Sequence, residues 1–122
     1  MGVRRTLPVA VTDAWAFLFS EEGLGIWLGK VKDLKWEKGE KYKTGNGTQG
    51  VVRVINPLSH VRITWKKKDW DNFSTLQVRT IKGKDKITIS FHQDRMKDST
   101  QREAMLTHWE TVLDKLEGKL KQ

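Results

Sequence analysis

The sequence predicts an α+β protein in which a curved antiparallel sheet of about six or seven strands surrounds one long C-terminal helix, with two short helices after the first strand. Two periodicities predict this class. Residues 31–92 form short alternating runs separated by turn residues, whereas apolar residues near the C-terminus recur at three- and four-residue steps. The 122 residues contain no linker-like stretch, so we expect one domain, 1–122, with one core.

The first quarter of the chain predicts one strand and two short helices. Residues 3–9 have β-forming character, and Thr12 with Asp13 offers an N-cap for the first helix. Ser20, which two glutamates follow, predicts the start of the second helix, because carboxylates stabilise the positive end of a helix dipole. Gly29 is expected to end this second helix.

The central region predicts an antiparallel meander. Residues 40–44 and 49–55 are β-prone runs joined by Gly45, Asn46 and Gly47, which tolerate positive φ and suit a tight turn. This turn joins two strands and does not open a helix, so it is not a phosphate-binding loop.

Two further strands and a hairpin follow in the meander. Residues 60–66 alternate, which predicts one buried face formed by Val61, Ile63 and Trp65. Residues 73–81 and 84–91 predict the next hairpin, with its turn at Lys82 and Gly83.

The C-terminal segment predicts an amphipathic helix of more than about five turns. Thr100 with Glu103 forms a capping-box pattern at its start. The apolar stripe that follows consists of Met105, Trp109, Val112, Leu113, Leu116 and Leu120. A stripe of this length needs a wide apolar surface, which the upstream strands are expected to supply.

Composition narrows the function classes. The chain has no cysteine, which excludes disulfides and thiolate chemistry, and no apolar run long enough to span a bilayer, so we expect a cytoplasmic protein. The formal net charge is +8, but the basic residues are spread along the chain. We therefore favour a solvated basic surface over nucleic-acid binding. Among the tryptophans, Trp70 lies between two aspartates and is the one most expected to be exposed.

Four segments resemble a known superfamily. The opening LPVAVTDAWAFLFSEEGLGIWLG, with Trp15 and Trp27, is similar to the start of START and birch-pollen-allergen (SRPBCC) domains. The stretches GTQGVVRVINPLSHVRITW, KITISFHQDRM and REAMLTHWETVLDKLEGKL resemble the family of activators of the heat-shock protein 90 ATPase. The resemblance implies a helix-grip fold over nearly the whole chain. One departure is His108, where many members carry glycine before the helix tryptophan.

The helix-grip fold implies a space between the bent sheet and the last helix, where a ligand would bind. We predict that an apolar or lipid-like small molecule binds there, with His108 as a polar contact. Each residue of this lining is more often ordinary core than part of a binding site, because the interior of any folded domain must be packed. The predicted lining is Trp65, Leu76, Val78, Ile89, Phe91, Met105, His108, Trp109 and Val112.

Other functions stay open at this point. By analogy with the family name, and because the surface is basic, a second hypothesis is a chaperone-regulating or other protein-interaction domain, with a chaperone partner and a role in stress response. An enzyme of the cyclase or hydrolase type is a third hypothesis, for which His108 is the main candidate and His92 near Asp94 is a weaker acid/base pair. The spacing of His60, His92 and His108 matches no metal site, and we expect no cofactor and a monomer or homodimer.

Overall fold

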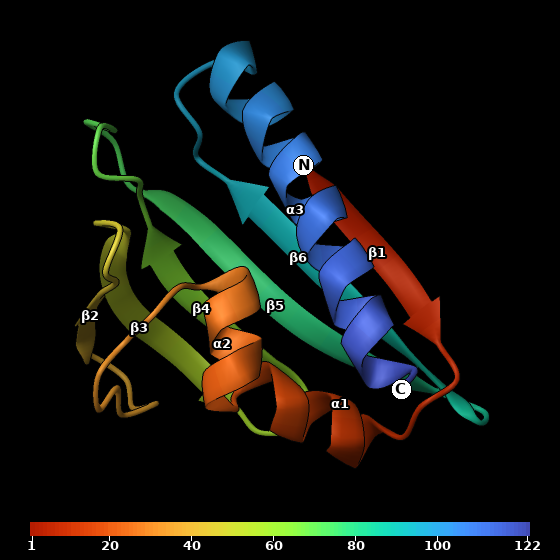
Figure 1. Ribbon diagram of the computed structural model, residues 1–122. Coiled ribbons are helices and arrows are strands. Elements are labelled where there is room, and N and C mark those ends of the chain that lie inside the picture. Colours follow the sequence, from red (N-terminus) through yellow and green to blue (C-terminus); the bar gives the residue numbers. More distant parts are fainter.

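The structure is a computed structural model that describes residues 1–122, and it has the predicted helix-grip architecture. One six-stranded antiparallel sheet has the order β1-β6-β5-β4-β3-β2, and all three helices cover the same face of it (Figure 1). None of the helices is long and apolar enough to cross a membrane. Along the chain the elements are β1 (Gly2–Leu7), α1 (Val11–Leu18), α2 (Glu21–Trp27), β2 (Lys41–Lys43), β3 (Gln49–Asn56), β4 (His60–Trp65), β5 (Ser74–Gly83), β6 (Lys86–Asp94) and α3 (Ser99–Leu120).

The long helix α3 packs into the sheet as its stripe predicts. It has 22 residues, about six turns. Trp109 is fully buried and stacks on Phe91 of β6 with ring centroids 4.7 Å apart. On β4, the predicted inward residues Val61, Ile63 and Trp65 are all at most 2% exposed. The buried apolar side chains form one continuous core of 22 residues.

A cluster of ion pairs attaches the edge strand β1 to α3. The Arg5 guanidinium lies 2.6 Å from Glu117, 3.0 Å from Asp114 and 3.3 Å from Glu110, which are carboxylates on successive turns of the helix. The hydrogen bond to Glu117 raises the pKa of Arg5. Because Arg5 points toward the helix, the outward residues of β1 are its neighbours Arg4 and Thr6.

Two predicted helix caps are wrong and one is confirmed. The first helix begins at Val11 after Ala10, which gives no side-chain cap, so Thr12 and Asp13 lie within its first turn. The backbone N–H of Gln101 donates to Asp98 at 2.9 Å, so Asp98 caps α3 and Thr100 is already helical. Ser20 caps α2 as predicted, accepting from the backbone N–H of Gly23 at 3.1 Å. Gly29, with φ of 127°, follows the end of α2 as expected.

The predicted turn of the last hairpin is displaced by two residues. Gly83 pairs with Lys86, so the turn consists of Lys84 and Asp85, while Lys82 still belongs to β5. Asp85 adopts a positive φ of 56°, a conformation that aspartate tolerates better than most residues. The glycine-rich turn of residues 45–47 joins β2 to β3 as predicted.

Candidate functional site

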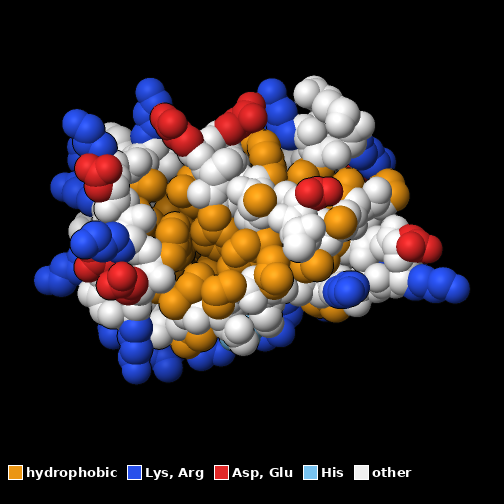
Figure 2. Space-filling model, turned by 90° about the horizontal axis from the view of Figure 1, so that it is seen from below, with side chains coloured by type: hydrophobic (Ala, Val, Ile, Leu, Met, Phe, Trp, Pro, Cys, Tyr) orange, Lys and Arg blue, Asp and Glu red, His pale blue; other side chains and the backbone are white.

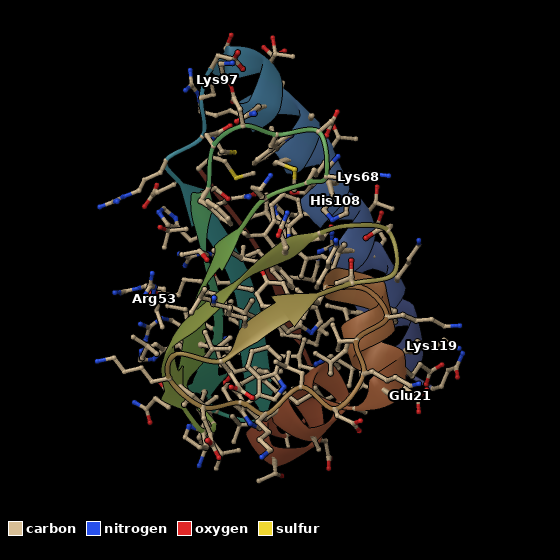
Figure 3. The ribbon with its side chains drawn as sticks, turned by 90° about the vertical axis from the view of Figure 1, so that its left-hand side faces the viewer. Glu21, Arg53, Lys68, Lys97, His108 and Lys119 are labelled. Atoms are coloured by element: carbon tan, nitrogen blue, oxygen red, sulfur yellow. The ribbon has the colours of Figure 1, made fainter.

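A cleft of about 410 Å³ opens where α2, α3 and two loops meet. The loops are the β2–β3 turn and the β4–β5 connection. Figure 3 shows two of its lining residues, Lys68 and His108, on the helix side of the sheet. The cleft is lined by residues 25–29, Asn46, Thr48, Trp65, residues 67–69 and His108.

Two buried tryptophans line the cleft. Trp27 and Trp65 are each 2% exposed, so the cleft borders directly on the aromatic part of the core. The indole Nε1 of Trp27 donates to the Leu18 carbonyl at 2.7 Å. The indole Nε1 of Trp65 is buried and has no hydrogen-bond partner. A buried donor without an acceptor is unfavourable, so an acceptor brought close to Trp65 would be stabilised there.

His108 is the polar side chain that α3 contributes to the cleft. Its ring lies 4.6 Å from the Trp109 ring and 6.4 Å from the Trp65 ring, measured between centroids. Burial lowers the pKa of His108, and the cations Lys67 and Lys115 lower it further. The imidazole is therefore neutral at pH 7 and offers one donor and one acceptor.

The β4–β5 loop supplies the charged rim of the cleft, and side-chain contacts attach it to α3 and to the segment before α3. The Asn72 side chain exchanges hydrogen bonds of 3.0 and 3.1 Å with the Gln101 side chain of α3. Asp71 forms an ion pair of 3.2 Å with Lys97. The prediction that Trp70 is exposed is wrong: its ring packs edge-on against Trp65 at 5.2 Å, and it is half-buried. The packing of Trp70 on the Trp65 indole therefore has more influence on its burial than the two aspartates beside it in sequence.

The structure divides the nine predicted lining residues into two groups. Trp65 and His108 line the cleft. The other seven are at most 3% exposed and belong to the continuous core: Leu76, Val78, Ile89, Phe91, Met105, Trp109 and Val112. Sequence reasoning missed the ten other lining residues: residues 25–29, Asn46, Thr48 and residues 67–69. Those at 46, 48 and 67–69 lie in turns or loops that no periodic pattern marks, whereas Trp27 lies on α2, where helical spacing predicts only that it is buried.

A second group of apolar side chains lies on the face of the molecule that is at the bottom of Figure 1. Figure 2 shows hydrophobic side chains gathered around a hollow on this face, which includes α1. The half-buried aromatic side chains of Trp15, Phe19 and Trp36 pack on one another, with ring centroids 4.6 Å apart for Trp15–Phe19 and 4.8 Å for Phe19–Trp36. Trp36 is also 6.0 Å from Trp27, which lines the cleft. The aromatic layer therefore continues from the cleft to this cluster.

The other two histidines lie away from the cleft. His92 and Asp94 come together at the end of β6, with His92 Nε2 3.0 Å from Asp94 Oδ2, and both side chains are at least half exposed. His60 Nδ1 contacts the hydroxyl of Ser59 at 2.9 Å. Neither histidine is near enough to the cleft to line it.

The architecture and the cleft define the class. A bent antiparallel sheet around a C-terminal helix, with a cleft beside that helix, is the helix-grip arrangement of SRPBCC domains. The chain belongs to the activator of Hsp90 ATPase homolog 1-like protein family, whose model matches residues 8–121.

Solved structures agree with this fold. The chain is similar to protein MLL2253 from Mesorhizobium loti (18% identity, TM-score 0.84), covering 99% of this chain and 96% of that one. It is similar to CalU16 from Micromonospora echinospora (16% identity, TM-score 0.81), covering 98% and 73%. It is also similar to the Aha1 dimer from Colwellia psychrerythraea (16% identity, TM-score 0.78), covering 98% and 94%. A sequence comparison with curated proteins gives no match.

Proposed function

We propose that this domain binds a small apolar or lipid-like molecule that carries one polar or anionic group, and that it does so without catalysing a reaction. The observation that carries the proposal is a cleft of about 410 Å³ bordered by two buried indoles, with a neutral imidazole beside them. This volume falls within the range of ordinary small-molecule sites, roughly 300–1,000 Å³.

The lining favours a ligand with two ends. The small exposed parts of Trp27 and Trp65, together with Ile26 and Leu28, form the apolar part of the lining, and burial of an apolar body against them drives binding. Lys67 and Lys68 outnumber Asp69 at the rim, and this excess of positive charge favours a carboxylate or another anionic head. His108 can accept or donate a hydrogen bond at the boundary between the two ends. The seven predicted residues inside the core would contact the ligand only where its body extends beyond the cleft into the interior.

A screen by thermal shift tests the proposal. We expect one class among long-chain fatty acids, sterols and aromatic carboxylic acids to raise the melting temperature in a concentration-dependent way. Gly25 lines the cleft, and a Cβ at this position would meet no atom within 4 Å, so Gly25→Leu adds bulk beside the cleft at low cost to the fold. We expect this variant to keep its stability and lose the shift.

A matched variant controls for the glycine replacement. Gly118 is also helical and also has open space around its Cβ position, but it does not line the cleft. Gly118→Leu should keep the ligand-induced shift. The proposal fails if every compound class leaves the melting temperature unchanged, or if Gly25→Leu and Gly118→Leu respond to the ligand alike.

A protein-interaction role is the second candidate. The family description names an activator of the Hsp90 ATPase. Of the 23 Lys and Arg side chains, only Arg5, Lys97, Lys119 and Lys121 form ion pairs, so 19 have no carboxylate partner within the chain. Free cations favour an acidic partner surface. Binding to an Hsp90 chaperone that weakens steeply with salt, together with a changed ATPase rate, would favour this role; an unchanged rate and no binding at low salt would exclude it.

Location and assembly stay predictions. We propose a cytoplasmic protein that is a monomer or a homodimer, and sedimentation of the purified chain distinguishes the two states.

A further inference from the structure

The face of the sheet away from the helices carries its own concave site. No helix covers this face (Figure 1), and a depression of about 390 Å³ opens on it with no hydrophobic residue in its lining. Arg53, one of its lining residues, lies on the opposite side of the sheet from His108 and Lys68 (Figure 3). The depression is therefore separate from the cleft described above.

Strand register builds the floor of this depression as two polar rows. In the first row Arg62 of β4 pairs with Gln77 of β5, which pairs with His92 of β6. The guanidinium of Arg62 donates to Gln77 Oε1 at 3.1 Å, which leaves Gln77 Nε2 free to donate.

The second row lies two residues further along the same strands. Thr64 pairs with Thr75, which pairs with Asp94. Thr64 Oγ1 accepts from the backbone N–H of Val51 at 2.8 Å, so its own hydroxyl proton remains available. Both rows thus present donors to the depression.

Backbone irregularities bring two more arginines to the rim. The register between β3 and β4 shifts between Val52 and Val54, so Arg53 is the extra residue of a β-bulge. A bulge changes the direction of a side chain, and here Arg53 is exposed and lines the depression. Arg95, which follows β6, has a positive φ of 62° and lines the opposite end.

Charge identifies the kind of ligand. Arg53, Arg62 and Arg95 line one depression, and none of them pairs with a carboxylate. The single carboxylate of the lining, Asp94, already contacts His92 at 3.0 Å and the N-terminal ammonium of Met1 at 3.7 Å. Within the lining, three guanidinium groups and one carboxylate leave an excess of two positive charges, and the Met1 ammonium adds to it, so the depression favours a dianion over a monoanion. Guanidinium groups bind phosphate oxygens through paired, charge-assisted hydrogen bonds.

We propose that the outer-face depression formed by Arg53, Arg62, Arg95 and the amide of Gln77 binds a phosphate monoester dianion of a small, hydrophilic molecule. The absence of apolar side chains in the lining excludes an apolar body as the group that the site recognises. The site is independent of the proposed cleft ligand, because the two lie on opposite faces of the sheet.

Nuclear magnetic resonance titration tests this site with methyl phosphate, a dianion at neutral pH, against dimethyl phosphate, a monoanion. Ionic strength is held constant with chloride. We expect saturable shifts at the Gln77 side-chain amide and at the Arg95 backbone amide with methyl phosphate, and at least about tenfold weaker binding of dimethyl phosphate. The double variant Arg53→Gln/Arg62→Gln should bind methyl phosphate about a hundredfold more weakly.

A double variant of equal charge serves as the control. Arg4→Gln/Lys86→Gln removes two cations from exposed positions of β1 and of the far end of β6, and neither residue lines the depression. Its affinity for methyl phosphate should stay within about twofold of the unmodified protein, since more distant charges are screened by salt. The proposal is overturned if the two phosphates shift the same amides with equal affinity, if both double variants weaken binding equally, or if no saturable shift occurs at millimolar methyl phosphate.

Discussion

The indole Nε1 of Trp109 in α3 donates a hydrogen bond of 2.8 Å to Oε1 of Gln93 in β6. Gln93 is fully buried, and its Nε2 donates in turn to the Ser74 hydroxyl of β5 at 2.8 Å. The Ser74 hydroxyl donates to the Trp65 carbonyl at 2.6 Å. A buried polar chain therefore connects the helix to three strands, and it fixes how α3 sits on the sheet.

Replacing Gln93 should show how much this buried hydrogen-bond network contributes to stability. Gln93→Met has a similar volume but leaves the buried Trp109 Nε1 without an acceptor, so we expect the free energy of unfolding to fall by about 1–3 kcal/mol. Chemical denaturation measures it. Trp109→Phe removes the donor of the same hydrogen bond. The free energy of unfolding should therefore fall by less in the double variant than the sum of the losses in the two single variants. Additive losses would mean that the two side chains do not depend on each other.

Truncating a leucine of α3 should destabilise the protein only where that leucine lies on the buried face of the helix. Leu116 is fully buried, so Leu116→Ala should lower the free energy of unfolding by about 2–5 kcal/mol. Leu106 lies on the same helix but is 46% exposed, so Leu106→Ala should change it by less than about 0.5 kcal/mol. Comparable losses in the two variants would contradict the observed orientation of the helix.

Gly50 should tolerate no side chain. A Cβ at this position would lie 1.8 Å from the Thr64 carbonyl oxygen and 2.7 Å from the Tyr42 hydroxyl. The Tyr42 hydroxyl itself donates to that carbonyl at 2.6 Å, so Gly50→Ala must displace a strand or break this bond. We expect a clear loss of thermal stability. Gly118→Ala, in open helical space, should stabilise the protein by about 1 kcal/mol, and equal effects would refute the steric explanation.

His108 should make stability fall in mild acid. Its folded-state pKa lies below the ordinary value of 6.5, so the unfolded chain takes up a proton more readily than the folded chain. The stability that the neutral His108 contributes is fully present above the unfolded-state pKa of about 6.5. It is lost as the pH falls from there through the lower pKa of the folded state. His60, whose pKa burial also lowers, acts with the same sign.

Denaturation midpoints at about pH 7.5 and about pH 5 provide the measurement. His108→Gln should lose less stability between these two conditions than the unmodified protein. Leu106→Gln, at an exposed and non-titrating position of the same helix, is the control and should keep the original difference. If both variants behave alike, burial of His108 does not set the pH response.

The parts of the fold that sequence predicts are those with a local period. Alternation on β4 and the stripe of α3 each place a run of side chains on one face, so their buried residues follow directly from spacing. Helix caps are harder to predict from sequence. Asp98 and Thr100 are both acceptable N-caps, and the choice between them depends on where the chain leaves β6. Trp70 was misjudged because its contact with Trp65 is tertiary.

The candidate site was predicted only in part for a related reason. Trp65 and His108 sit on periodic elements and were identified from their positions. Asn46, Thr48 and Lys68 reach the cleft from a turn and a loop, and only the assembled sheet brings them to the same place. The outer-face arginine Arg53 depends on a bulge, which alternation alone does not indicate.

The indole N–H signals of the six tryptophans give the most direct test of ligand binding in the cleft. On titration with the compound that the thermal screen selects, we predict that the Trp27 and Trp65 signals shift and saturate together in the unmodified protein and in Gly118→Leu, and stay fixed in Gly25→Leu. Signals of Trp27 and Trp65 that do not move while the melting temperature rises, or that move equally in Gly25→Leu, would contradict the proposed site.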